Sequence, residues 1–378
     1  MQARIVSAVI AAGVVVVLGL TGVVLTTASK SHLAALRHAV TSPTPTATSK
    51  PILQPSVSPT PVMTVSPEPS PTSVATPTAS QTEPSFRELL IPKPGGNAYA
   101  IVVGQDGAVW FTESECVSGI GRLSEAGTWQ HWPITGDCES QPLAITRGPD
   151  GNLWFADVWS AYGRVTPDGE ITRFTLPESC YPSGITFGPD GNIWLAVGTP
   201  QPQSFIAKVT TDGTELAEYQ LSASAGMPRG IVAGPDGAIW FTESRGIGRL
   251  TTSGVLTEFP VHGSPYQIAV GPDKNLWFVE TAGGIGRLTT GGALTEFETP
   301  GLGGLQWITV GPDDAMWFTA AASDSIGRIS MAGDVTSYAL PNGGSQPIGI
   351  MSTPDGKIWF TEASIDATGR IGILTLKS

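Results

Sequence analysis

The sequence predicts an all-β fold over residues 85–378, a seven-bladed β-propeller built from four-stranded blades. A tryptophan recurs roughly every 40 residues, which is the spacing of propeller blades. A Gly-Pro-Asp-Gly turn or a close variant precedes each of these tryptophans, and no segment with helical periodicity interrupts the series. The seven tryptophans are Trp110, Trp154, Trp194, Trp240, Trp277, Trp317 and Trp359.

The fourth repeat shows the predicted unit of four short strands. Residues 230–233, 238–243, 247–250 and 255–259 are each rich in strand-forming residues and are separated by turn residues. The seventh repeat ends at residues 369–374 without a fourth strand, whereas residues 86–92 precede the first repeat without a partner. We therefore expect this N-terminal strand to complete the last blade and remove its open edge.

Two segments of different composition precede the propeller. Residues 5–28 carry no charge and are long enough to cross a bilayer, so residues 1–40 are predicted to be a single-pass membrane anchor with the propeller outside the cytoplasm. The alternative is a signal peptide cleaved near Thr26-Thr27-Ala28, which would give a secreted protein. Residues 41–84 are rich in Pro, Thr and Ser and predict a disordered linker, with candidate sites for O-glycosylation.

Charge and cysteine content narrow the functional classes. The chain has 32 acidic and 20 basic residues, a net charge of −12, so nucleic acid is not an expected partner. The propeller is expected to be a monomer. Cys116 and Cys138 lie in loops of neighbouring repeats and could form a disulfide in an oxidising compartment, with Cys138–Cys180 as the rival pairing.

The residue that opens each innermost strand should lie at the mouth of the central channel. Two tyrosines, an arginine and an amide occur among these positions, and a tryptophan follows the amide, so the mouth could bind a small cyclic peptide, a glycan or a protein. Channel packing without a ligand is the other interpretation. The positions are Tyr99, Leu143, Ser183, Arg229, Tyr266, Gln306 and Ile348, and the adjacent tryptophan is Trp307.

Carboxylates recur three residues after the repeat tryptophan, and a base recurs in each third strand. Carboxylates that converge on a channel could bind Mg²⁺ or Ca²⁺, but charge pairing between strands is the preferred interpretation. The carboxylates are Glu113, Asp157, Glu243, Glu280 and Glu362; the bases are Arg122, Arg164, Lys208, Arg249, Arg287, Arg328 and Arg370. The turn aspartates are interpreted as turn-forming residues. His131 is expected to be solvated on an outer strand, and His262 is the one plausible base near the mouth.

The recurring string Gly-Pro-Asp-Gly-x-(Ile/Leu)-Trp-Phe-Thr-Glu followed by Ile-Gly-Arg-(Ile/Leu) resembles the virginiamycin B lyase family of seven-bladed propellers. The resemblance implies Mg²⁺-assisted elimination that linearises streptogramin B depsipeptides. The family's catalytic histidine falls at Ile348 and its second histidine at Gln306. The family's glutamates fall at Gln346 and at Ala363, which follows Glu362, and its tyrosine is kept as Tyr99.

These departures favour an extracytoplasmic ligand-binding or interaction module without lyase chemistry, for which no cofactor is expected. The first alternative is a Mg²⁺-dependent carbon–oxygen lyase in which His262 or Glu362 replaces the missing groups. The second is an ectodomain that binds a protein partner on its rim.

Overall fold

The computed structural model describes residues 56–57, 84–92, 97–114, 118–124, 126–134, 140–200, 203–363 and 369–376. The predicted anchor, nearly all of the predicted linker, Cys116 and Cys138 lie outside these residues. No helix in the described part of the chain is both long and apolar enough to cross a membrane.

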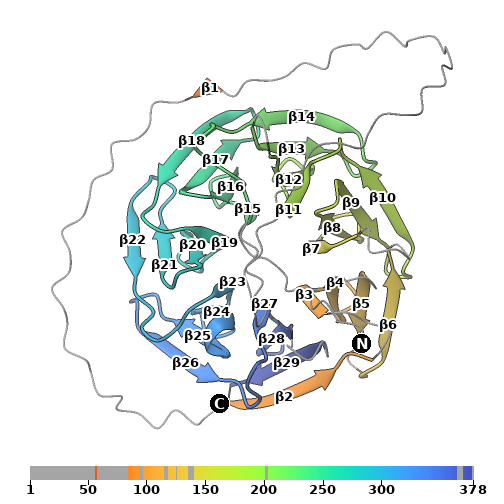
Figure 1. Ribbon diagram of the computed structural model, residues 1–378, viewed down its shortest axis with the longest axis vertical. Coiled ribbons are helices and arrows are strands. Elements are labelled where there is room, and N and C mark those ends of the chain that lie inside the picture. Colours follow the sequence, from red (N-terminus) through yellow and green to blue (C-terminus); the bar gives the residue numbers. More distant parts are fainter. Residues whose placement is uncertain are drawn as a thin grey trace, which may run out of the picture. The chain divides into compact units, whose positions relative to one another are not determined.

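Seven antiparallel sheets surround a central axis and form a β-propeller (Figure 1). The strands of each blade run from innermost to outermost in chain order, except that β2 is the outermost strand of blade 7 and the short β1 adds to the outer edge of blade 4. Blade 1 contains β3 (Asn97–Val103), β4 (Val109–Ser114), β5 (Gly119–Leu123) and β6 (Trp129–Pro133). Blade 2 contains β7 (Pro142–Arg147), β8 (Leu153–Asp157), β9 (Ala161–Val165) and β10 (Ile171–Thr175). Blade 3 contains β11 (Tyr181–Phe187), β12 (Ile193–Gly198), β13 (Phe205–Val209) and β14 (Glu215–Gln220).

The remaining four blades follow the same order. Blade 4 contains β15 (Ile231–Ala233), β16 (Ala238–Glu243), β17 (Gly246–Thr251) and β18 (Val255–Pro260). Blade 5 contains β19 (Pro265–Val270), β20 (Leu276–Glu280), β21 (Ile285–Leu288) and β22 (Leu294–Phe297). Blade 6 contains β23 (Leu305–Val310), β24 (Met316–Ala320), the 3-10 helix η1 (Ala321–Ser323), β25 (Ser325–Ile329) and β26 (Val335–Ala339). Blade 7 contains β27 (Pro347–Ser352), β28 (Lys357–Glu362), β29 (Arg370–Thr375) and β2 (Ser85–Leu90).

The predicted closure of the ring is confirmed. Strand β2 pairs antiparallel with β29, with Phe86 opposite Leu374 and Leu89 opposite Ile371. The first ordered strand of the propeller and the last thus share one blade, and in Figure 1 β2 lies at the outer edge of that blade. Hydrogen bonding across the two ends removes an unpaired edge that would otherwise expose backbone donors and acceptors.

One short strand lies within the segment predicted to be a disordered linker. Strand β1 (Ser56–Val57) pairs in parallel with β18, with Ser56 opposite Val255. Strand β18 is the outermost strand of blade 4, so its outer edge has free backbone groups that can accept an additional strand. The prediction of a disordered linker concerns mainly residues outside the described ranges and stays a prediction.

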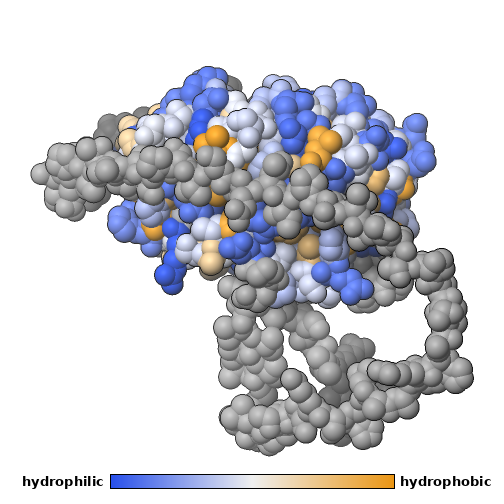
Figure 2. Space-filling view, turned by 90° about the horizontal axis from the view of Figure 1, so that it is seen from above, coloured by the Kyte–Doolittle hydropathy of each residue, from blue (hydrophilic) through white to orange (hydrophobic). Residues whose placement is uncertain are grey.

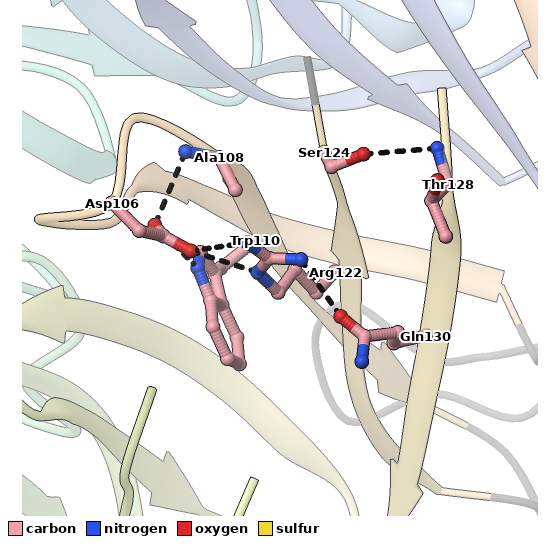
Figure 3. Close-up of polar contacts among 7 residues, drawn as sticks. All are labelled: Asp106, Ala108, Trp110, Arg122, Ser124, Thr128 and Gln130. Atoms are coloured by element: carbon pink, nitrogen blue, oxygen red, sulfur yellow. Dashed lines mark hydrogen bonds and ion pairs between the residues drawn. The ribbon is translucent and has the colours of Figure 1, made fainter. Parts of the chain in front are cut away.

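Each blade is organised around its repeat tryptophan. In six blades the indole N–H donates to the aspartate of the preceding turn, at 2.8–3.2 Å, and an aromatic side chain of the outermost strand stacks on the ring. Figure 3 shows the hydrogen bonds of this arrangement in blade 1, where Asp106 accepts from Trp110 and from both Nε and Nη2 of Arg122. The turn aspartate therefore does more than form a turn, because it also orients the core tryptophan.

The core consists of one hydrophobic cluster between each pair of neighbouring blades. The cluster between blades 3 and 4, for example, joins Trp194 and Tyr219 to Ile239 and Phe241. Burial of such faces supplies the main driving force for packing the sheets into a ring. On the face drawn in Figure 2 hydrophilic residues predominate and hydrophobic ones are scattered, as on an ordinary solvated surface.

Candidate functional site

The residues predicted to line the channel mouth lie on β-bulges. In six blades the innermost strand has a register irregularity at its beginning, and in each case a mouth residue lies in it. A bulge re-aims a side chain without ending the sheet, so the strand can continue into the core while its first residue is turned. The residues on these bulges are Tyr99, Leu143, Ser183, Tyr266, Gln306 and Ile348.

Buried threonines two residues after the repeat tryptophan link the bulges of neighbouring blades. The Thr361 hydroxyl donates to the Tyr99 carbonyl oxygen at 2.6 Å and accepts from the bulge amide of its own blade at 2.8 Å. The Thr242 hydroxyl donates in the same way to the Tyr266 carbonyl oxygen at 2.7 Å. Each hydroxyl satisfies two buried backbone groups and fixes one blade against the next. Sequence reasoning missed these residues, although the recurrence of Trp-Phe-Thr is a signal for them.

Four of the predicted ligand-binding residues form one cluster at the mouth. The Tyr99 and Tyr266 hydroxyls are hydrogen-bonded at 3.0 Å. The Trp307 ring packs edge-on against Tyr99, with ring centroids 5.4 Å apart, and against Tyr266 at 6.3 Å. The Arg229 guanidinium lies over the Tyr266 ring at 5.1 Å from its centroid. Side chains from blades 1, 4, 5 and 6 thus meet, and Gln306 is half-buried beside Trp307 on the same bulge.

The cluster offers several kinds of contact to a ligand. Burial, followed by the neighbouring Tyr266, raises the pKa of Tyr99 well above its usual value, so its hydroxyl remains a neutral donor and acceptor. The half-buried Arg229 guanidinium forms no ion pair with any described residue and can bind a carbonyl or an anion. The half-buried Trp307 ring supplies apolar surface, whereas Tyr266 is buried beneath it and Arg229.

Exposed hydrophobic side chains follow the mouth over blades 2 to 4. Trp159, Tyr181 and Met227 are 56%, 36% and 41% exposed, which is unusual for side chains of this size. Met227 lies two residues before Arg229, and Ser183 donates to the carbonyl oxygen of the intervening Pro228 at 2.7 Å. Of these side chains, Met227 is the one that the chain places beside the cluster, through Arg229.

The predicted pairing between the carboxylates and the third-strand bases is wrong in five blades. In these blades the base lies opposite the repeat tryptophan and contacts the turn aspartate instead, as in the Arg249–Asp236 pair at 2.6 Å. Burial acts to raise the pKa of Asp236, but hydrogen bonds from Trp240 and Arg249 outweigh it and lower the pKa. Arg370 does not occupy the repeat position, because Ile373 lies opposite the last repeat tryptophan while Arg370 lies opposite Glu362.

The recurring carboxylates face the outermost strand of their own blade. The buried Asp157 pairs with Arg173 at 2.9 Å, and the buried Glu113 contacts His131. His131 is only 19% exposed, so the expectation of a solvated histidine is also wrong. Glycine in the intervening third strand lets these side chains meet across it, since Gly121 and Gly163 lie opposite His131 and Arg173.

In three blades the facing residue is another carboxylate. Burial, and then the charge of Glu258, raises the pKa of Glu243 to about 8. Burial, and then Glu88, raises the pKa of Glu362 to about 7. Glu280 behaves in the same way beside Glu296. Two nearby carboxylates in a poorly solvated site favour a protonated state for one of them.

His262 lies away from the aromatic cluster. Its side chain is 88% exposed, and its Nδ1 lies 2.8 Å from a carboxylate oxygen of Glu296 on the outermost strand of blade 5. The hydrogen bond and the charge of Glu296 raise the pKa of His262. Cys180 is a free thiol, buried in the core between blades 2 and 3.

In the described part of the chain three of the recurring carboxylates meet other acidic side chains in pairs. Mg²⁺ in proteins is usually bound through one or two carboxylates, and water or substrate supplies its other ligands. No group of three or more His, Cys, Asp or Glu side chains converges anywhere in the described ranges. Glu362, the one predicted metal ligand, is fully buried within blade 7 and faces Glu88 on the outermost strand.

Comparison with known proteins agrees with this architecture. The family model described as virginiamycin B lyase family matches residues 78–264 and 199–375. The chain belongs to this family. A catalytically inactive histidine-to-alanine variant of virginiamycin B lyase from Staphylococcus aureus, solved with quinupristin, is 33% identical, with a TM-score of 0.71, over 78% of this chain and 100% of that chain.

Two further solved structures are similar to this chain. A streptogramin B lyase is 31% identical, with a TM-score of 0.71, over 79% of this chain and 100% of that chain. The extracellular domain of a proposed one-component system from B. thetaiotaomicron shares the fold, at 15% identity and a TM-score of 0.59, over 78% of this chain and 42% of that chain. No curated protein matches the chain significantly.

Proposed function

We propose that this member of the virginiamycin B lyase family is a ligand-binding module whose channel mouth recognises a small cyclic peptide, without the family's elimination chemistry. The observation that carries the proposal is the cluster of Tyr99, Tyr266, Trp307 and Arg229 from four blades. The cluster combines aromatic surface with a guanidinium that has no carboxylate partner among the described residues. A cyclic peptide carries both of the matching features, apolar side chains and a ring of carbonyl oxygens.

The absence of a base among the mouth residues argues against elimination. Removing a proton next to a carbonyl requires, within hydrogen-bond reach of it, a group that can accept a proton near neutral pH, such as an imidazole or a carboxylate. The seven mouth positions hold Tyr, Leu, Ser, Arg, Tyr, Gln and Ile, and Ile348 stands where the resemblance places the catalytic histidine. The Staphylococcus aureus relative is catalytically inactive when a histidine is replaced by alanine. A chain without that imidazole is expected to bind without turnover.

The proposed location of the propeller, outside the cytoplasm, rests on the sequence alone. Residues 5–28 would hold the propeller outside the cytoplasm through the Pro/Thr/Ser-rich linker, and signal cleavage near residue 28 would release it instead. Glycans and protein partners remain alternative ligands for the same mouth. The family's own chemistry is the second candidate function, because the relatives with 31–34% identity are lyases.

One experiment separates binding from turnover. The full chain is mixed with quinupristin and Mg²⁺, heat of binding is measured by calorimetry, and the linear product is sought by mass spectrometry. Saturable heat without product, weakened about tenfold or more in Arg229→Gln and Tyr266→Ala, supports the proposal. Linear product at an enzyme-like rate, lost in His262→Ala but kept in the exposed-surface variant Lys274→Gln, would establish the lyase instead. If neither heat of binding nor linear product is detected, both the binding proposal and the lyase alternative are refuted.

A further inference from the structure

A cavity of about 580 Å³ lies at the junction of blades 7 and 1, where the two ends of the propeller meet. Its lining is mostly apolar and includes Leu89, Val109, Leu123, Gly127, Trp359 and Ile373. It also includes the turns before β28 and before β6, which lie at the end of the blades opposite the start of the innermost strands. The cavity is therefore separate from the channel mouth, and its volume is within the range of small-molecule sites.

The other blade junctions show what this space holds elsewhere in the ring. In six blades an aromatic side chain of the outermost strand stacks on the repeat tryptophan, with ring centroids 5.2–5.8 Å apart. In five of these the same ring also covers a positive-φ glycine in the turn of the next blade. The glycine and ring pairs are Gly169–Trp132, Gly213–Phe174, Gly254–Tyr219, Gly292–Phe259 and Gly333–Phe297.

At the junction of blades 7 and 1 the aromatic ring is missing. Leu89 occupies the equivalent position, because it lies opposite Ile371 just as Phe259 lies opposite Ile247. The corresponding turn glycine, Gly127, has nothing within 4 Å of the place where a side chain would begin. A leucine leaves unfilled the flat space that an aromatic ring fills at the other junctions.

Trp359 has also lost the partners that enclose the other repeat tryptophans. Its indole N–H has no hydrogen-bond partner among the described residues, because Asp355 contacts Thr353 and Lys357 instead. Ile373 stands where other blades carry the arginine that lies over the ring. Trp359 is half-buried, whereas the other six repeat tryptophans are at most 1% exposed. Its ring therefore contributes aromatic surface to the cavity.

One cation in the lining is available to a ligand. Arg87 projects from β2 and is exposed, and it forms no ion pair with any described residue. Lys357 pairs with Asp355, so these two charges compensate each other. A carboxylate on a ligand would thus find its partner in Arg87, to which it can bind through two parallel hydrogen bonds.

We propose that this cavity binds a small aromatic carboxylic acid, with the ring against Trp359 in the place of the missing outer-strand aromatic and the carboxylate on Arg87. The ring has to come from outside the chain's N-terminal part, because residues 1–84 contain no Phe, Tyr or Trp. Residues 377–378 beyond the last described strand are Lys and Ser and supply none either.

The test uses naphthoate as the probe, with the full chain and calorimetric titration. Naphthoate is expected to bind, while cyclohexanecarboxylate, which lacks a flat ring, and naphthamide, which lacks the charge, each bind about tenfold more weakly. Leu89→Phe restores the internal aromatic and should abolish binding, with an unchanged or higher melting temperature. Arg87→Gln, at an exposed position, should weaken naphthoate but not naphthamide. Arg229→Gln at the mouth serves as the control and should leave naphthoate binding unchanged.

Each contrary outcome overturns the proposal in its own way. If naphthoate gives no heat of binding, or if cyclohexanecarboxylate binds with equal affinity, the proposed aromatic site is refuted. Equal affinity for naphthamide removes the role of Arg87. Loss of binding in Arg229→Gln places the ligand at the mouth. If Leu89→Phe destabilises the full chain and naphthoate does not bind, another segment of the chain already fills the cavity. If Leu89→Phe fails to fold, the comparison of Arg87→Gln with the wild type still tests the proposal.

Discussion

Replacing Glu243 by glutamine should stabilise the propeller at alkaline pH and have little effect at pH 5. Burial and Glu258 raise the Glu243 pKa from its ordinary value near 4.5 to about 8, so the folded protein keeps a proton that the unfolded chain releases. The contribution of Glu243 to the stability of the wild type is therefore fully present below about pH 4.5. This contribution is lost as the pH rises through 8. Glutamine imitates the protonated side chain at every pH.

The magnitude follows from the pKa shift. A shift of one unit corresponds to about 1.4 kcal/mol, so the difference between the two values sets an upper limit on the order of 5 kcal/mol above pH 8. Relaxation around an ionised group reduces such limits, and we expect a gain of about 2–4 kcal/mol at pH 9. Urea unfolding followed by tryptophan fluorescence at pH 5, 7 and 9 measures it.

The matched variant Glu258→Gln separates the two causes of the shift. It removes the neighbouring charge but leaves Glu243 buried, so it should give a smaller gain at pH 9 than Glu243→Gln does. A stability difference between Glu243→Gln and wild type that does not change with pH would refute the reasoning. A larger gain at pH 5 than at pH 9 would reverse its sign.

Two other perturbations test the devices that position the site. Asp236→Asn should destabilise the protein by about 1–3 kcal/mol in urea unfolding, because its carboxylate accepts from the Trp240 indole and from an arginine; Asp355→Asn, where no indole bond exists, should cost less, and an equal loss in both would contradict this account. Thr361→Val should leave the Tyr99 carbonyl oxygen and a bulge amide without a partner, at a cost of about 1–3 kcal/mol, and it should also weaken ligand binding at the mouth. Unchanged unfolding and binding in Thr361→Val would show that the bulge needs no such link.

The repeat architecture was predictable because its signals are local and periodic. A buried tryptophan, a turn of fixed chemistry and short strand-forming runs recur in register, so each repeat independently predicts the same unit. Closure was also predictable, since the strand without a partner at one end and the missing strand at the other are both visible in the sequence. The equivalent positions at the start of each innermost strand were predictable as well, because the same repeats can be matched residue by residue.

The pairing of charges was not predictable from the repeat. Whether Arg249 reaches a turn aspartate or the carboxylate after Trp240 depends on which residues lie opposite each other, and the register places the arginine opposite the tryptophan. The assignment of Arg370 to the repeated basic position was wrong for the same reason. The last repeat reads Arg370-Ile371-Gly372-Ile373, so isoleucine takes the position after Ile-Gly and the arginine precedes it.

The amino-acid sequence by itself determined the number of blades, the strand that closes the ring and the residues at the starts of the innermost strands, since all three depend on short-range patterns repeated along the chain. Only the tertiary structure decided that Tyr99 and Tyr266, 167 residues apart, share a hydrogen bond, and that Leu89 leaves a cavity beside Trp359. Contacts of this kind depend on how bulges turn individual side chains and on which blades the ring brings face to face, and neither is encoded in any one repeat.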